Sequence, residues 1–186
     1  MMAEDISLRV VKILNEHDVP YMLVGSLSTN FHSIIRSTKD ADIVIQAGLA
    51  ETARLIAWHC DVLTVDPQLG FENVTAMQRI ILRADADSFV VELFSLSDDA
   101  HDQQRFQRRQ RLEWLGEPTW IATAEDALIT KLRWAQGAGR EKDIVDARNL
   151  IAVQGDALDW PYIESWCDRH GSRPLLERIR GELRGR

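Results

Sequence analysis

The feature that most constrains the fold is a change in hydrophobic pattern at about residue 124. Before it, short β-rich apolar runs are interleaved with segments of helical periodicity; after it, only helical periodicity remains. Strands are expected at 21–24, 40–46, 80–83 and 89–94, with a weaker one near 61–65, and helices at 4–17, 26–35 and 49–58. Ile34, Ile35 and Trp58 are expected to face inward from these helices, and Asp85 and Asp87 to lie in a hairpin turn. Helices of the second part are expected at 124–136, 141–153, about 160–169 and 174–183. The pattern predicts an α/β (α+β) core over 1–120 and a C-terminal helical part over 121–186 that packs on it.

The composition is that of a soluble globular protein: 45% of its 186 residues are hydrophobic and 27% are charged. No apolar run approaches the length of a membrane span, and the N-terminus carries acids where a signal peptide would carry lysines. Cys60 and Cys167 are far apart, so neither a disulfide framework nor a structural zinc site is expected, and we predict a cytoplasmic protein. The net charge of −7 argues against a large nucleic-acid-coating surface but leaves room for a local basic pocket.

Two aspartates stand at the start of the strand DADIVI. Asp40 and Asp42 are two residues apart and therefore project from the same face of a strand, with the small Ala41 on the other face. Two like charges held together repel unless a cation lies between them, and Mg²⁺ binds carboxylate oxygens readily. The pair therefore indicates a metal site. The alternative is a pair of turn acids at the entrance of an ordinary strand.

A third acid, Glu92, lies inside the most apolar run of the chain, Val90–Phe94. Burying a carboxylate without a partner costs on the order of several kcal/mol, because the charge loses its hydration. Glu92 therefore needs a partner or a metal. The other reading is a surface acid on a half-exposed strand.

The turn Gly25-Ser26 follows an expected strand and opens an expected helix. A glycine there lets the backbone approach a phosphate, and a helix N-terminus offers free N–H groups and a positive dipole end. Carboxylates for metal and an amide-rich turn for phosphate are the parts that phosphoryl transfer requires. By itself, Gly25-Ser26 would be a plain strand–helix connection.

These stretches together resemble the polymerase-β nucleotidyltransferase superfamily, whose pattern is hG[GS]…Dh[DE]h…h[DE]h. The run Arg36-Ser37-Thr38-Lys39-Asp40-Ala41-Asp42 is similar to the R-x-T-x-D-x-D form of a small bacterial group that includes the AbiEii-type toxins of type IV toxin–antitoxin systems. Two later segments, 125–132 and 140–146, resemble the K-L-x-A and R-x-K-D-x-x-D helices of that group. The spacing from Gly25 to Asp40 is longer than in the most compact members of the superfamily, and Glu92 stands where Asp is usual.

The resemblance implies a mixed sheet flanked by helices, two Mg²⁺ ions, and transfer of a nucleotidyl group from an NTP such as ATP. Asp40 and Asp42 would bind both metals, and Glu92 would bind the catalytic one and help to activate the acceptor hydroxyl. The residues expected to contact the nucleotide are Gly25, Ser26, Arg36, Lys39, Lys131 and Asp143. The acceptor could be RNA, a protein or a small molecule, and a toxin or antitoxin could be a partner.

Several of the charged residues allow a second, purely structural interpretation. Lys131 could lie on a solvated helix face, and Asp143 with Asp146 could belong to a surface salt-bridge network. The basic stretch Arg105, Arg108, Arg109 and Arg111 could be solvated, or could bind RNA or an acidic partner. An enzyme is the leading hypothesis, and a catalytically inactive, antitoxin-like or regulatory binding module is the alternative.

Overall fold

The computed structural model describes residues 3–72, 74–84 and 89–185. The acids Asp85 and Asp87, expected in a hairpin turn, lie outside these ranges. The chain forms two compact units, one of Met1–Leu27 with Ser37–Ala122 and the other of Ser28–Arg36 with Thr123–Arg186. The second unit therefore includes a short segment from the first third of the sequence.

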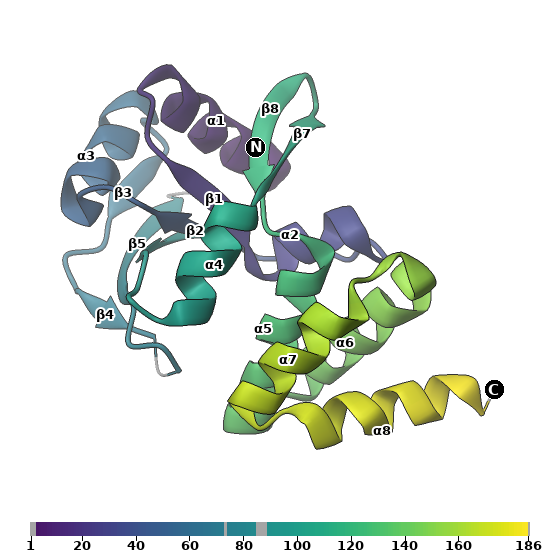
Figure 1. Ribbon diagram of the computed structural model, residues 1–186. Coiled ribbons are helices and arrows are strands. Elements are labelled where there is room, and N and C mark those ends of the chain that lie inside the picture. The colour runs from purple at the N-terminus through teal and green to yellow at the C-terminus, as the bar shows by residue number, and fades with distance from the viewer. Residues whose placement is uncertain (1–2, 73, 85–88, 186) are drawn as a thin grey trace. The chain divides into compact units, whose positions relative to one another are not determined.

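The first unit is built on an eight-stranded mixed sheet (Figure 1). Its strands are β1 (Tyr21–Val24), β2 (Asp40–Ile45), β3 (Leu63–Val65), β4 (Gly70–Phe71), β5 (Gln78–Ala84), β6 (Val90–Ser95), β7 (Gln110–Trp114) and β8 (Glu117–Ile121). The strand order is β3-β5-β6-β2-β1-β8-β7, with β4 paired to β5. The pairs β2–β6 and β1–β8 are parallel and the remaining pairs are antiparallel. The predicted α/β class is confirmed.

The helices of the first half are α1 (Ala3–Glu16), α2 (Gly25–His32), α3 (Leu49–His59) and α4 (Ala100–Arg108). The sheet buries apolar side chains of its central strands, among them Met22, Val24, Val44 and Phe94, together with Phe106 of α4. In β2 the first residues alternate, so that Ala41 is fully buried while Asp40 and Asp42 are half-buried. This alternation places both aspartates on one face of the sheet, as the sequence predicts.

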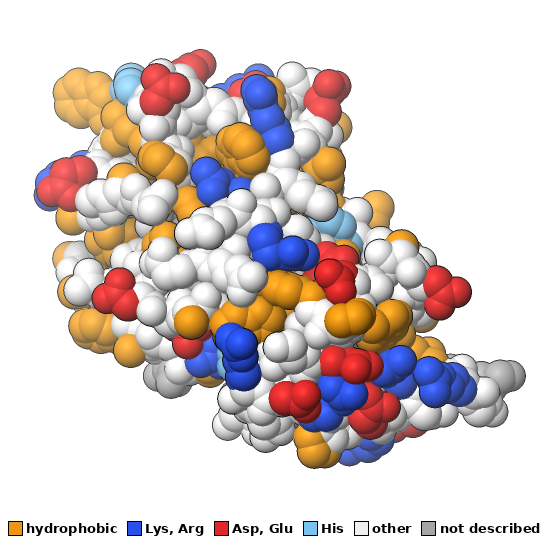
Figure 2. Space-filling view, in the orientation of Figure 1, with side chains coloured by type: hydrophobic (Ala, Val, Ile, Leu, Met, Phe, Trp, Pro, Cys, Tyr) orange, Lys and Arg blue, Asp and Glu red, His pale blue; other side chains and the backbone are white. Residues whose placement is uncertain are grey.

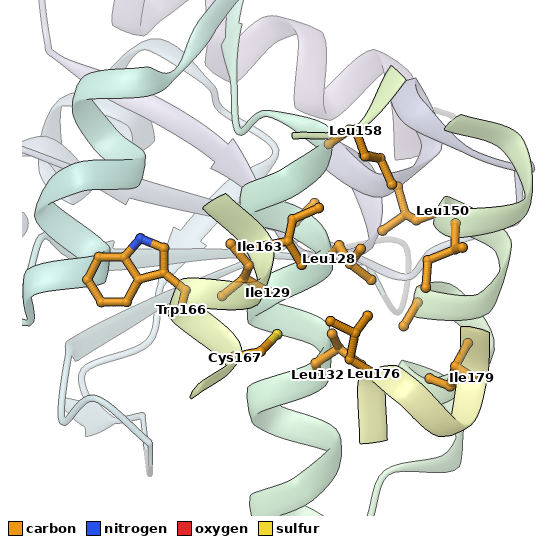
Figure 3. Close-up of a cluster of buried hydrophobic side chains, with 14 residues drawn as sticks. Leu128, Ile129, Leu132, Leu150, Leu158, Ile163, Trp166, Cys167, Leu176 and Ile179 are labelled. Carbon is orange, nitrogen blue, oxygen red and sulfur yellow. The ribbon is translucent and has the colours of Figure 1, made fainter. Parts of the chain in front are cut away.

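The second unit contains α5 (Ala124–Ala138), α6 (Glu141–Gln154), the short 3₁₀ helix η1 (Gly155–Ala157), α7 (Trp160–His170) and α8 (Arg173–Arg184). Its core is formed by side chains from all four α-helices, including Leu128, Leu150, Ile163 and Leu176 (Figure 3). Thr123 caps α5 by accepting a hydrogen bond from the Asp126 amide. The Asp126 carboxylate is in turn held by the hydroxyls of Thr123 and Tyr162. The start of α5 is thereby fixed by a fully bonded buried acid.

Two sequence-based expectations about apolar side chains are wrong. We expected α2 to run to Ile35 with Ile34 and Ile35 turned inward, but it ends at His32 and these two side chains are 59% and 80% exposed. The Asn30 side chain accepts a hydrogen bond from the Arg36 amide and donates one to its carbonyl, and such local side-chain bonds compete with helix continuation.

Trp58 was expected in the core but is 85% exposed. The buried stripe of α3 consists of Leu49, Thr52, Ala53 and Ile56. Trp58 lies two residues beyond Ile56 and so falls on the opposite side of the helix.

Charged side chains on the described surface of α7 and α8 are of mixed sign and pair with one another (Figure 2). Arg173 and Arg180 both contact Glu164, at 2.9 and 2.8 Å, and both contact Glu177. No described helix is long and apolar enough to cross a membrane.

Candidate active site

The three predicted acids lie on adjacent strands at the centre of the sheet. In the parallel pairing of β2 with β6, Asp42 is directly opposite Glu92, and Asp40 is opposite Val90. Directly opposed residues on neighbouring strands point to the same face, with strands about 4.8 Å apart. Asp40, Asp42 and Glu92 therefore project from one face of the sheet, although 50 residues separate Asp42 from Glu92 along the chain.

The Gly25-Ser26 turn lies beside Asp42. Val24 is paired with Asp42 across β1 and β2, and α2 starts immediately afterwards at Gly25. Gly25 has a φ of +62°, a conformation that side-chain-bearing residues rarely adopt, and a Cβ at this position would overlap the Asp42 carboxylate. A glycine is thus required here by both its backbone and its neighbour. Ser26 is buried in the first turn of α2.

Asp40 and Lys39 occupy the entrance of β2. The Thr38 hydroxyl donates a hydrogen bond to the Asp40 carboxylate and another, of 3.1 Å, to its carbonyl. Lys39 is exposed, while its backbone carbonyl accepts a hydrogen bond from the Val90 amide. The carboxylate is thereby oriented by a local turn, and the lysine ammonium is left in solvent next to it in sequence.

Glu92 has a basic partner. Arg79 of β5 contacts both carboxylate oxygens of Glu92 at 3.4 Å, and the two side chains are 35% and 20% exposed. Arg79 supplies the partner that a partly buried acid needs. An ion pair of this length and exposure stabilises a protein by about 0–1 kcal/mol, so Glu92 can exchange this contact for another cation at little cost.

The donor set fits Mg²⁺, which is bound by one or two carboxylates and by the phosphates of a substrate. Asp40 and Asp42 provide carboxylate oxygens on one face, and the strand register brings Glu92 beside Asp42. With the side chains as they stand, no group of three or more His, Cys, Asp or Glu among the described residues is close enough to hold a metal. The register and the donor chemistry are suited to a metal, whereas the Glu92 carboxylate is engaged by Arg79.

A buried ion-pair network occupies the second unit and contains the other predicted residues. The Lys131 ammonium lies 2.8 Å from Asp143 Oδ1 and 2.9 Å from Asp146 Oδ2. Arg36 donates to both oxygens of Asp146 at 2.9 and 2.8 Å. Since Lys131, Asp143 and Asp146 are all at most 4% exposed, this is not a surface salt-bridge network, and Lys131 is not on a solvated face. Two basic and two acidic groups balance within it.

Asp146 is the centre of this network and has a shifted acidity. Burial would raise its pKa, but the hydrogen bonds and charges of Arg36 and Lys131 outweigh burial, and the pKa of Asp146 is lowered overall. Asp143 Oδ2 is buried without a hydrogen-bond partner among the described residues. Asp146 was noted in the sequence only as a neighbour of Asp143, and the signal for its role was the (i, i+3) spacing in α6.

The basic stretch is less available than its sequence indicated. Arg105 is 3% exposed, and its Nε lies 2.8 Å from Asp102 Oδ1 within α4. The Arg109 guanidinium stacks over the rings of Phe106 and Trp120, and burial lowers the pKa of Arg109. Arg108 is half-buried, and Arg111 is exposed. An arginine patch made of all four residues is therefore not present on the surface.

The mixed α/β architecture matches that of solved nucleotidyltransferases, so the chain has a nucleotidyltransferase fold. It resembles the solution structure of the antibiotic-resistance factor ANT(2'')-Ia, with a TM-score of 0.66, 11% identity, and 97% of each chain covered. It also resembles an antigenic nucleotidyltransferase-like protein from Paracoccidioides brasiliensis, with a TM-score of 0.60, 18% identity, and 95% of this chain and 91% of that one covered.

A third similar structure is the lincosamide antibiotic adenylyltransferase LnuA with lincomycin bound, with a TM-score of 0.53, 15% identity, and 80% of this chain and 96% of that one covered. No protein-family model matches the sequence, and no curated protein matches it. At these low sequence identities, the likeness shows a shared fold and no more.

Proposed function

We propose that the protein is a Mg²⁺-dependent nucleotidyltransferase that transfers a nucleotidyl group from an NTP to an acceptor hydroxyl. The observation that carries the proposal is the opposition of Asp42 and Glu92 on parallel strands, with Asp40 on the same face and the Gly25-Ser26 turn beside Asp42. The nucleotidyltransferase fold supports it. Carboxylates and a helix N-terminus at one sheet face suit a triphosphate and its cation.

In the proposed reaction the acceptor oxygen bonds to the α-phosphorus as the bond from that phosphorus to the bridging oxygen breaks, and pyrophosphate leaves. Glu92 accepts the proton of the acceptor hydroxyl, and Asp40 and Asp42, together with Glu92, would hold the metal ions. The amides at the start of α2 and the Ser26 hydroxyl orient the phosphates, and Lys39 offsets their charge. Bound Mg²⁺ would neutralise phosphate charge and orient the reacting oxygens.

The buried network suggests positioning roles for Arg36, Lys131 and Asp143. Arg36 lies four residues before Asp40 in the chain. Its Nε and Nη2 each donate a hydrogen bond to one carboxylate oxygen of Asp146. The positive charges of Arg36 and Lys131 are already compensated by acids. We therefore propose that the network secures the segment leading into β2, and that any contact of Lys131 with a triphosphate would require release of an acid.

We further propose that the protein belongs with the AbiEii-like group. The residues that carry this resemblance in the R-x-T-x-D-x-D, K-L-x-A and R-x-K-D-x-x-D stretches are Arg36, Lys131, Asp143 and Asp146. Their assembly into one buried network supports a common structural reason for the three motifs. A toxin-like role for the protein is part of this proposal.

A transfer assay tests the proposed function. The protein is incubated with each of the four α-³²P-labelled NTPs and Mg²⁺, with cell extract as the source of RNA, protein and small-molecule acceptors. Label should enter one acceptor fraction with the wild type and not with Asp40→Asn/Asp42→Asn. Equal labelling by both proteins, or labelling by neither with any NTP, would contradict the proposal and favour an inactive binding module.

A further inference from the structure

The free edge of the sheet at β7 has the composition of a self-complementary interface. Strand β7 ends the strand order, and in the described part of the chain it pairs only with β8 (Figure 1). Gln110, Arg111, Leu112 and Glu113 are all exposed, and Leu112 is 37% exposed. An edge strand of this kind presents unpaired backbone groups to another chain.

The backbone of β8 shows which β7 residues face the free edge. The Pro118 carbonyl accepts hydrogen bonds from the side chains of Asn15 and Tyr21, and the Trp120 amide donates to the Tyr21 hydroxyl. Pro118 and Trp120 thus direct their backbone groups away from β7. In an antiparallel ladder, residues opposite such positions form the non-hydrogen-bonded pairs, so their own backbone groups point outward. These residues are Glu113, opposite Pro118, and Arg111, opposite Trp120.

The side chains of β7 complement those of an identical strand. In an antiparallel pairing centred on Leu112, Arg111 lies opposite Glu113 of the second copy, and Glu113 lies opposite Arg111 of the second copy. Each such pair exchanges both backbone hydrogen bonds and brings opposite charges together on one face. The two Leu112 side chains meet on the other face. The outward-pointing backbone groups of Arg111 and Glu113 and the opposite charges of their side chains therefore both agree with a two-fold axis at Leu112.

We propose that β7 is a self-association edge, through which two copies of the chain pair antiparallel and extend the sheet across a two-fold axis at Leu112. The tight hairpin supports this because Leu115 and Gly116, with φ of +51° and +82°, hold β7 and β8 in a fixed register. An interface made by one short strand is weak, so the dimer should form at high protein concentration.

Sedimentation velocity over a wide concentration range tests the proposal through charge reversal. Wild type should show a concentration-dependent monomer–dimer equilibrium. Arg111→Glu and Glu113→Arg each place like charges opposite one another and should weaken the dimer roughly tenfold or more. An equimolar mixture of the two variants should dimerise again, because acidic and basic strands then face each other. The double variant Arg111→Glu/Glu113→Arg should also recover the wild-type equilibrium.

Hydrogen exchange locates the contact. On raising the wild-type concentration, the Arg111 and Glu113 amides should become protected, whereas the Leu112 amide, which faces β8, should not change. Arg54→Glu on α3, at another exposed arginine, is the control and should dimerise as wild type does. A wild type that stays monomeric up to millimolar concentration would overturn the proposal. So would single variants that dimerise unchanged, or a mixture that fails to recover the dimer.

Discussion

At the scale of single residues, Gly25 and Glu92 show how cross-strand neighbours shape the candidate site. Gly25 is required by its positive φ and by the neighbouring Asp42 carboxylate. Glu92 is held by Arg79, which lies two positions away diagonally on the adjacent strand. Both constraints arise from cross-strand neighbours.

Gly25→Ala should destabilise the protein by more than about 1 kcal/mol, because alanine at a positive φ is strained and its Cβ would displace the Asp42 carboxylate. Nucleotidyl transfer should be lost as well. The matched control is Gly137→Ala in α5, where a Cβ meets open space and the change should be neutral or stabilising by about 0.5–1 kcal/mol. Urea unfolding measures both, and a Gly25→Ala protein with wild-type stability and activity would contradict the argument.

Glu92→Gln should abolish transfer while changing the free energy of unfolding by less than about 1 kcal/mol, because the ion pair with Arg79 is long and partly exposed. Arg79→Gln removes the same ion pair but leaves the carboxylate. It should therefore have a similar effect on stability and keep transfer. If both variants are inactive, or both active, Glu92 is not distinguished from its partner and its role as metal ligand and base is wrong.

At the scale of secondary-structure elements, Asp146 connects α6 to α5 and to the segment before β2. Its carboxylate accepts hydrogen bonds from Arg36 and forms an ion pair with Lys131, so that one side chain joins three stretches of the sequence. A buried ion pair is weak evidence of net stabilisation, but removal of one partner leaves a buried charge uncompensated.

Asp146→Asn should lower the free energy of unfolding at neutral pH by about 3 kcal/mol, because Lys131 and Arg36 lose their shared anion. The surface control Glu51→Gln removes an exposed ion pair with Arg54. It should change the free energy of unfolding by only about 0.3–0.5 kcal/mol, the usual contribution of an exposed ion pair on a helix. Urea unfolding at neutral pH makes the comparison. Equal effects of the two substitutions would show that the network is not stabilising.

The same variant tests the acidity of Asp146. The pKa of Asp146 is lowered in the folded protein, whereas an aspartate in the unfolded chain has a pKa of about 3.9. The unfolded chain therefore binds this proton more tightly than the folded protein does. The stabilisation should be fully present above about pH 4. It should be lost as pH falls through the folded pKa. The stability difference between wild type and Asp146→Asn should therefore shrink in acid, and a difference independent of pH down to acid unfolding would contradict this.

At the scale of the whole molecule, the proposed function makes stability depend on ligand. A ligand that binds only the folded protein stabilises it by about 2.7 kcal/mol at one hundred times its Kd. Mg²⁺ with a non-hydrolysable NTP should raise the Tm of the wild type, and neither Mg²⁺ nor NTP should do so as strongly by itself. Asp40→Asn/Asp42→Asn should lose the shift, as measured by differential scanning calorimetry. An equal shift in both proteins would place the nucleotide elsewhere.

The sequence by itself determined the fold class, because the strand and helix periodicities are strong and well separated: the predicted strands at Asp40 and Phe89 and all four C-terminal helices are confirmed within a few residues. It also identified Asp40, Asp42 and Glu92 as acids next to apolar runs, since strand alternation is a local property. Tertiary structure decided what local patterns do not encode. The register of β2 on β6 brought Asp42 opposite Glu92, and the register of β5 on β6 brought Arg79 to Glu92. Long-range packing also buried Lys131 with Asp143 and Asp146, and left Ile35 and Trp58 exposed, because burial depends on which elements meet and not on residue type.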